Sequence, residues 1–241
     1  MKIVMKFGGT SVADIAKIKN VANIIAKQSK TADVAVVVSA MGKTTNALTA
    51  LAHQITDKPN LRELDALLST GENTSVALLA LALNSIGVPA KSFNAMQLGI
   101  ITNDNFGDAE IMHINTWSIP YKVIPVITGF QGMTEHGDIT TLGREGSDTS
   151  AVAIAAAIVA DYCDIYTDVD GVYTADPNVV KDAKKLDFIS YDDMLKMANN
   201  GAKVLHPRSV STAQKYNVPI RVRGTFTPND LGTLVAASKR R

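Results

Sequence analysis

The sequence predicts an α/β protein in which helices cover both faces of a mostly parallel β-sheet. Short β-branched runs alternate with long amphipathic runs along the 241 residues. Several short runs are apolar on both faces, as the central strands of a parallel sheet are. The repeated strand–helix–strand order is typical of a sheet covered on both sides.

The elements are justified in chain order by these runs. Apolar runs predict strands at 2–7, 34–40, 88–93, 122–130, 163–169 and 218–223. Amphipathic stretches predict helices at 12–29, 43–56, 61–86, 146–160, 190–199 and 206–217. Gly, Asn, Asp and Thr between short β runs indicate hairpins at the sheet's rim, at 99–113 and 130–142. Functional groups are expected at the carboxyl ends of the strands.

Composition excludes several function classes. Lys and Arg number 24 against 23 Asp and Glu, and this near-neutral balance argues against a nucleic-acid binder. The single cysteine, Cys163, excludes a disulfide framework and is expected to be a small buried hydrophobe. No apolar run reaches the roughly 18 residues of a membrane helix, and the N-terminus lacks a signal-peptide core. We expect one cytoplasmic domain over residues 1–241, without a membrane or nucleic-acid partner.

The segment KFGGTSV at 6–12 follows the first predicted strand and opens a helix. Gly8 and Gly9 leave backbone N–H groups bare for an anion, and the next helix directs its N-terminal dipole to the same place. Lys6 adds a positive charge, so the segment predicts a phosphate-binding turn. Alternatively, it is a tight turn in which Ser11 and Asp14 form a capping box for the helix, and both interpretations can hold together.

Two further segments predict a pocket for a small polar ligand. In VVVSAMGKTTNAL at 36–48, Ser39 and Thr45 can contact such a ligand, although Thr44 and Asn46 can equally be helix caps. In LLSTGEN at 67–73, a helical glycine suggests close approach of another segment. Glu72 lies there among leucines and needs a partner such as a ligand ammonium, unless it faces solvent beside a kink.

The segment TTLGREGSDTSAVAIAAA at 140–157 combines glycines with Arg144 at a predicted helix start. An arginine can bind a carboxylate through two parallel hydrogen bonds. Asp148 is either a plain N-cap or, if Ser147 caps the helix, a carboxylate that orients a lysine.

The C-terminal half contains two candidate nucleotide segments. YTDVDGVYTADPNVV at 166–180 ends a strand in turn chemistry that suits a purine and ribose, or forms a plain surface loop. In NGAKVLHPRSV at 200–210, Lys203 can reach a phosphate or be an ordinary exposed lysine, and His206 is expected to cap a helix. The histidines and the cysteine form no metal-ligand pattern.

Taken together, these segments resemble the catalytic domain of the aspartate kinases, a branch of the amino-acid kinase family. The resemblance rests on KFGGTSV, VVVSAMGKTTN, LLSTGE, GFQGMT, TTLGREGSD, IYTDVDGVYTADP and GAKVLHPRSV. It implies a three-layer αβα sandwich with a mostly parallel central sheet, ATP in the C-terminal half and L-aspartate in the N-terminal half. The implied reaction moves the γ-phosphate of MgATP to the aspartate side chain. The product, 4-phospho-L-aspartate, leads to lysine, threonine, methionine and diaminopimelate.

The resemblance also assigns roles by motif. It implies that Lys6 stabilises the transferring phosphoryl group and that Asp148 holds Lys6. Residues expected around ATP are Lys6, Gly8, Gly9, Ser11, Thr167, Asp168, Tyr173, Asp176 and Lys203. Residues expected around the amino acid are Ser39, Thr45, Glu72, Phe130, Arg144, Gly146 and Ser147, with Arg144 on its α-carboxylate and Glu72 on its α-ammonium. Mg²⁺ is expected mainly on the ATP phosphates, so no protein ligand to a metal is named.

The chain departs from the family pattern at several places. Glu145 stands where the family often has glycine, and Asn178 stands where it commonly has arginine. The segment Asn115–Tyr121 is shorter than the helix usual there. The C-terminal ACT domains of the family are not expected, which leaves a homodimer through sheet-edge or helix contacts open. Two alternative functions stay open as well: a kinase for another small carboxylate such as glutamate or N-acetylglutamate, and a weakly active ligand-binding regulatory subunit.

Overall fold

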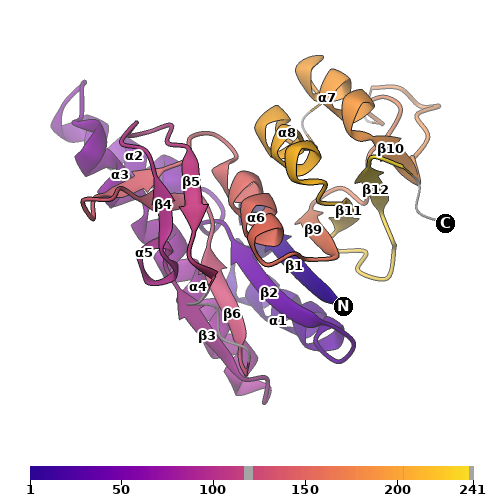
Figure 1. Cartoon of the computed structure of the whole chain (residues 1–241), viewed down its shortest axis with the longest axis horizontal. Helices are drawn as coiled ribbons and strands as arrows, with labels where there is room; N and C mark the ends of the chain where they lie inside the picture. Colours follow the sequence, from indigo (N-terminus) through magenta and orange to yellow (C-terminus); the bar gives the residue numbers. More distant parts are fainter. Residues whose placement is uncertain (117–121, 178, 203, 239–241) are drawn as a thin grey trace.

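The computed structural model describes residues 1–116, 122–177, 179–202 and 204–238, and its centre is an eight-stranded sheet (Figure 1). The strand order is β10-β12-β11-β9-β1-β2-β6-β3. The bounds are β1 Lys2–Phe7, β2 Asp33–Val38, β3 Ala90–Phe93, β6 Ile124–Thr128, β9 Tyr162–Thr167, β10 Phe188–Ser190, β11 Ile220–Gly224 and β12 Thr233–Ala236. Each of the predicted strands is present, and their pairings from β3 to β11 are parallel.

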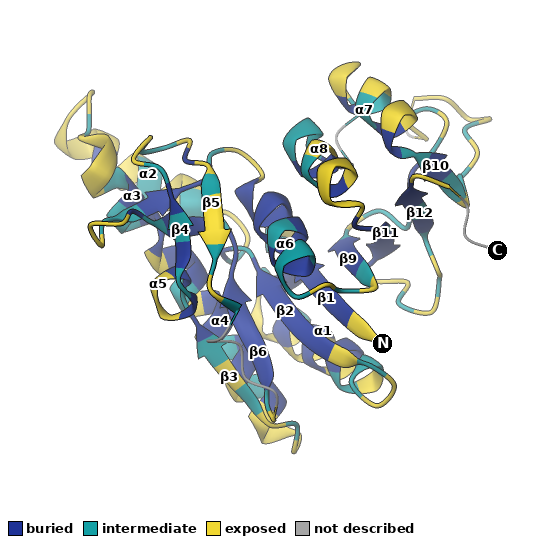
Figure 2. Ribbon diagram, viewed as in Figure 1, coloured by how far each residue is buried: buried dark blue, intermediate teal, exposed yellow. Residues whose placement is uncertain are grey.

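Alternate residues of the strands face opposite helical layers, which confirms the three-layer αβα prediction. Ile3 and Met5 of β1 belong to a core cluster with the helices α1 (Ile15–Gln28) and α4 (Thr70–Ser85). Val4 belongs to the other cluster, with α6 (Gly146–Ala157), α7 (Tyr191–Asn199) and α8 (Pro207–Tyr216). Figure 2 shows the central strands as the buried middle of the molecule. This alternation directs the side chain of Lys6, two residues after Val4, to the layer that contains α6.

The predicted helix at 61–86 is divided in two. α3 (Leu61–Leu68) ends at Ser69 and α4 begins at Thr70, while α2 (Thr44–Ile55) precedes them. Within the described ranges, the span Leu61–Ser85 is long and apolar enough to cross a membrane by length and composition, although half of its most apolar window is buried inside the protein (50%). Its packing against α1, β3 and β6 is that of a core helix.

The two predicted hairpins are present, but they do not extend the main sheet. β4 (Ile100–Thr102) pairs with β5 (Ile111–Ile114), and β7 (Gln131–Met133) pairs with β8 (Ile139–Thr141), both antiparallel. A parallel contact between β4 and β7 joins them into a separate four-stranded sheet, β5-β4-β7-β8. The hairpins expected at the sheet's rim therefore bond to each other and not to the strands of the main sheet.

Several short elements escaped prediction. The strands β10 and β12 pair in parallel with each other, and β12 is antiparallel to β11, so this edge of the sheet is mixed. A 3₁₀ helix, η1 (Gly9–Val12), and a short helix, α5 (Ala95–Leu98), were not expected either. These elements have three or four residues each, which is too short for hydrophobic periodicity to reveal them. The Asn115–Tyr121 comparison falls largely outside the described residues.

Candidate active site

The carboxyl ends of four parallel strands meet in register and bring the predicted site segments together. Phe7 of β1 lies opposite both Val38 of β2 and Tyr166 of β9. Val38 in turn lies opposite Thr128 of β6. Backbone hydrogen bonds continue beyond the strands, from Ser39 N to Phe7 O at 3.1 Å and from Gly129 N to Val38 O at 2.9 Å. The segments that follow these strands therefore form one continuous edge.

At this edge, Lys6 and Asp148 form an ion pair between β1 and α6. The distance from Lys6 Nζ to Asp148 Oδ1 is 2.6 Å, and the side chains are only 11% and 7% exposed. Asp148 lies inside the first turn of α6, because Glu145 occupies the N-cap position. Neither Ser147 nor Asp148 caps the helix, so the expected lysine-orienting contact is the one that the structure contains. Its catalytic role stays a prediction.

The glycine turn lies against this pair. A Cβ atom on Gly8 would be 3.5 Å from Lys6 Nζ, so the ammonium is adjacent to the turn's backbone. The following α-helix begins at Ile15, and the Asp14 side chain accepts a hydrogen bond from Lys17 N as its cap. The expectation that this helix directs its dipole at the turn is thus wrong, because η1 intervenes and Asp14 satisfies the helix end. The predicted capping box of Ser11 and Asp14 is wrong, because Asp14 is itself the N-cap of α1.

Ser11 is not a cap. It is fully buried, and its hydroxyl lies 2.6 Å from the hydroxyl of Thr225, which follows β11. This bond links η1 to the C-terminal part of the sheet. A contact between Ser11 and a nucleotide stays a prediction.

Glu72 is a buried carboxylate that is only half satisfied. Its Oε1 accepts a hydrogen bond from Ala40 N at 3.0 Å, whereas its Oε2 is buried without a partner among the described residues. Desolvation raises the pKa of Glu72 to about 7, and the Ala40 bond opposes that shift only in part. The solvent-facing alternative is wrong, since Glu72 is 2% exposed. A buried carboxylate oxygen with no donor fits a cationic ligand group.

The close approach expected at Gly71 is also present. A Cβ atom on Gly71 would lie 2.9 Å from the Cβ of Ala40. The absence of this atom lets α4 approach the segment after β2, which places Glu72 within reach of Ala40 N. Helix α2 starts at Thr44 with Lys43 at its N-cap position and no side-chain cap, so capping by Thr44 or Asn46 is wrong. Ser39 directly follows β2 and Thr45 is the second residue of α2, and both are half-buried.

The Arg144 segment lies at the start of α6. Gly146 and Ser147 are buried in its first turn, and a Cβ on Gly146 would lie 3.1 Å from the ring of half-buried Phe130. Arg144 and Glu145 are both exposed, and Arg144 has no bond or ion pair to a residue that the structure describes. Glu145, which stands where the family often has glycine, is thus in contact with solvent.

The candidate nucleotide segment leaves β9 at the same edge. Thr167 donates to Asp168 at 3.0 Å, and the Tyr173 hydroxyl donates to Asp170 at 2.9 Å, which raises the pKa of Tyr173. Asp176 is exposed in the following loop. Lys203 and Asn178 lie outside the described residues. His206 caps α8, since its Nδ1 accepts from Arg208 N at 3.3 Å, as predicted.

Sequence reasoning missed two side chains near the Arg144 segment, Asp65 and Arg208. Asp65 is buried in α3, although an aspartate in a helix is usually exposed. Arg208 directly follows His206-Pro207, but the motif drew attention to Lys203 instead. Both side chains bond to the backbone around 107–109 and 141–142.

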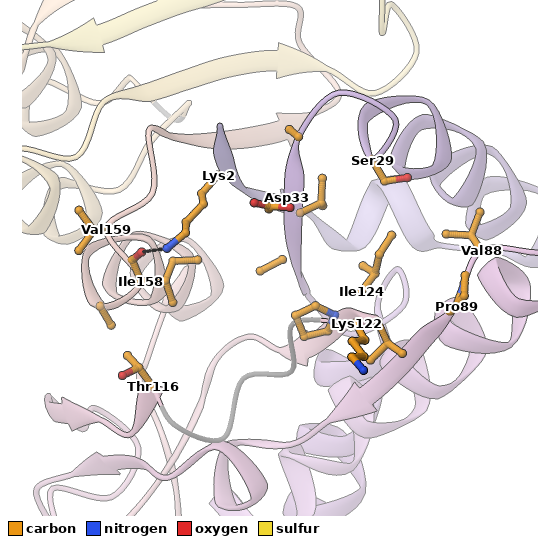
Figure 3. Close-up of a pocket in the computed structure, with 16 residues that line it drawn as sticks. Lys2, Ser29, Asp33, Val88, Pro89, Thr116, Lys122, Ile124, Ile158 and Val159 are labelled. Carbon is orange, nitrogen blue, oxygen red and sulfur yellow. Dashed lines mark hydrogen bonds between the residues drawn. The ribbon is translucent and has the colours of Figure 1, made fainter.

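A cavity of about 510 Å³ lies at the opposite ends of the strands. Lys2, Asp33 and Ile124, at the starts of β1, β2 and β6, line it (Figure 3). The Lys2 ammonium turns toward the carbonyl of Ile158, at 3.4 Å. Since this cavity contains none of the predicted site residues, it is separate from the candidate active site.

Comparison with known proteins shows which family has this arrangement. Residues 1–224 match the sequence model of the amino acid kinase family. The aspartokinase of Geobacillus stearothermophilus is 55% identical over 97% of this chain, and that of Thermus thermophilus is 52% identical over the same share. This chain spans 58% of the length of these curated relatives.

Solved structures with the same fold point to the same family. Aspartate kinase from Synechocystis is 46% identical, with a TM-score of 0.88, over 100% of this chain and 41% of that one. Aspartokinase III of E. coli, in complex with aspartate and ADP, is 30% identical, with a TM-score of 0.87, over 100% of this chain and 66% of that one. Uridylate kinase from Archaeoglobus fulgidus shares the fold, at 22% identity and a TM-score of 0.69 over 98% of this chain and 100% of that one. With a family match over residues 1–224 and these relatives, the chain belongs to the amino acid kinase family.

Proposed function

We propose that the protein transfers the γ-phosphate of ATP to the side-chain carboxylate of L-aspartate. The observation that carries this proposal is the buried, unpartnered Oε2 of Glu72, at the strand edge where Lys6 and Asp148 pair. An α-ammonium group supplies the donor that this oxygen lacks. Relatives at 52–55% identity are named aspartokinases, and the similar E. coli enzyme was solved with aspartate and ADP.

The proposed chemistry needs little acid–base help. A carboxylate is ionised at neutral pH, so no general base has to activate it. One carboxylate oxygen forms a bond to the γ-phosphorus, the bond from that phosphorus to the β–γ bridging oxygen breaks, and ADP leaves with the electron pair. The obstacle is repulsion between two anions. Lys6 opposes it with a positive charge, and Asp148 fixes the direction of that charge.

The amino acid is held from two sides in this proposal. Glu72 takes the α-ammonium, and exposed Arg144 takes the α-carboxylate through its planar fork. Ser39, Thr45, Phe130, Gly146 and Ser147 complete the pocket. A free amino group is required by this arrangement, which disfavours N-acetylated acceptors.

ATP is proposed to lie across the ends of β1 and β9. The Gly8–Gly9 turn would face phosphates through the Gly9 backbone, because the Gly8 N–H donates to Tyr166 O at 3.4 Å and the buried Ser11 hydroxyl bonds to Thr225. Thr167, Asp168, Tyr173 and Asp176 would surround the nucleoside, with Lys203 added from outside the described residues. No group of three His, Cys, Asp or Glu side chains that could hold a metal is present in the described ranges. In this proposal Mg²⁺ sits on the ATP phosphates and neutralises part of their charge.

Use of ATP and a free amino acid places the protein in the cytoplasm in this proposal. A homodimer formed through sheet-edge or helix contacts stays a prediction.

The test is ADP release with MgATP and L-aspartate, L-glutamate, N-acetyl-L-glutamate or no acceptor, with hydroxylamine to trap the acyl phosphate. We expect hydroxamate with L-aspartate alone. Turnover of another acceptor overturns the substrate and retains the chemistry. Aspartate binding without turnover favours a regulatory subunit.

A further inference from the structure

Arg208 is the second residue of α8, and its side chain bonds to the backbone just before Arg144. Its Nη1 donates to the carbonyl of Leu142 at 3.0 Å and to Asp108 Oδ1 at 2.9 Å. Its Nη2 donates to the carbonyl of Ala109 at 2.8 Å. The side chain is 27% exposed, so these bonds are partly shielded from water. A planar guanidinium can serve these acceptors together, whereas an ammonium cannot match that fork.

Asp65, which lies in α3, bonds to the same two backbone segments. Its Oδ2 accepts hydrogen bonds from Thr141 N and Gly107 N, both at 2.9 Å. Its Oδ1 accepts from the Thr141 hydroxyl at 2.7 Å. The two segments also bond to each other, from Ala109 N to Thr141 O at 2.9 Å. The segments at 107–109 and 141–142 are thus held from two different helices.

This double attachment ends two residues before Arg144. Leu142 is buried, and Gly143 has a φ of +73°, where a Cβ atom would lie 2.7 Å from Asp108 Oδ1. A bond from Gly146 N to Gly143 O, at 3.1 Å, closes the turn onto α6. Arg144 lies in that turn, exposed and without a side-chain partner in the described ranges. The direction of its side chain therefore depends on how the backbone before and after the turn is held in place.

We propose that Arg208, with Asp65 opposite it, is a positioning residue that holds Arg144 in place for the substrate carboxylate. This inference rests on the proposed function. It gives a role to the arginine of the His206-Pro207-Arg208 sequence. In this role, a residue on α8 sets the geometry of the amino-acid site. A misplacement of about 1 Å in such a site costs up to roughly 100-fold in rate.

The test compares Arg208→Met, Arg208→Lys and Asp65→Asn with Lys215→Met, which removes a cation from the same helix. We expect Arg208→Met to raise the KM for L-aspartate roughly 10- to 100-fold, with the KM for ATP unchanged. Arg208→Lys should recover only part of the loss, and Asp65→Asn should shift the same constant. Lys215→Met should leave both constants unchanged.

A double-mutant cycle separates positioning from a general structural role. In the Arg144→Ala background, Arg208→Met should add no further increase in the aspartate KM, because the group that it positions is gone. An additive effect, or an equal rise in the ATP KM, overturns the proposal. If Arg208→Met does not fold, Arg208→Lys is judged by the same criteria.

Hydrogen exchange gives a readout that does not depend on turnover. The amides at 141–146 should exchange faster in Arg208→Met than in the wild type, and those of α1 should not. Unchanged exchange in the folded variant overturns the anchoring. A wild-type protein that phosphorylates no acceptor defeats the proposed function, and the exchange result still decides whether Arg208 holds this turn.

Discussion

Lys6 and Asp148, from the first strand and a helix that starts well past the middle of the chain, meet at 2.6 Å in a site that is almost closed to water. Each side chain is costly to bury alone, and each removes the cost of the other. The ammonium is held next to the Gly8 backbone. The ion pair and the glycine turn are thus adjacent in the structure.

Replacement of Lys6 tests its catalytic role. We expect Lys6→Ala to lower kcat by roughly 100- to 1,000-fold, because a preorganised charge at the reacting phosphate is lost. The KM for L-aspartate should change far less. Lys2→Ala removes an exposed lysine from the same strand and should leave kcat unchanged. Steady-state kinetics of both variants decide the matter, and wild-type turnover in Lys6→Ala refutes the role.

The half-satisfied Glu72 predicts a pH dependence. Its pKa is raised to about 7, so it is mostly protonated below that pH and ionised above it. Only the ionised form attracts an ammonium, so the KM for L-aspartate should fall as pH rises through about 7. Glu72→Gln should show a high KM without this fall, and the KM for ATP should not follow it. A flat wild-type profile contradicts the assignment.

Arg144 is predicted to act in ground-state binding. Arg144→Ala should raise the KM for L-aspartate by about 10- to 100-fold, since hydrogen bonds to a charged group contribute about 1.5–3 kcal/mol. Arg62→Ala is the matched control, because Arg62 is also exposed and pairs only with Glu63 and Asp138 in the described ranges. Equal effects of the two changes exclude a specific role for Arg144.

The backbone of Glu145 predicts a stabilising substitution. Its φ is +53°, a left-handed conformation that costs a residue with a Cβ roughly 1–2 kcal/mol. Glu145→Gly should raise the free energy of unfolding by up to about 1 kcal/mol, or the Tm by about 2–4 °C. Asn217 has a similar φ of +51°, but asparagine tolerates it, so Asn217→Gly should gain less. Calorimetry of the two variants measures the difference.

Gly71 is predicted to be required for space and not for flexibility. Helix propensity alone favours alanine by about 1 kcal/mol. The 2.9 Å approach to the Ala40 Cβ should reverse this and destabilise Gly71→Ala by about 1–3 kcal/mol. Adding Ala40→Gly should restore much of the loss. Urea unfolding of the single and double variants checks this, and a stabilised Gly71→Ala removes the argument.

The sequence predicted the parts of the molecule that repeat a simple pattern. The strands of the central sheet were visible because they are buried on both faces, and their carboxyl ends located the Lys6 and Asp148 segments. Glu72 was visible because a carboxylate among leucines is unusual. The roles proposed for these side chains stay predictions.

What escaped prediction depends on contacts between distant segments. Asp65 resembles any charged residue of an amphipathic helix until β8 is seen to donate to it. Arg208 likewise needs the carbonyls of Leu142 and Ala109 to show its purpose. The short strands β10 and β12 depend on pairing between distant segments, β10 with β12 and β12 with β11.

The central position of β1 has a consequence for biosynthesis. Its neighbour on one side, β2, follows soon after, but its other neighbour, β9, begins only at Tyr162. At ordinary translation speeds, about 10–30 s pass between the two strands leaving the ribosome. During that time the edge of β1 that later pairs with β9, which includes the apolar residues Ile3, Val4 and Met5, has no partner strand. The nascent chain is therefore exposed to mispairing with other chains, and a slow ribosome or a missing chaperone should lower the yield of folded protein.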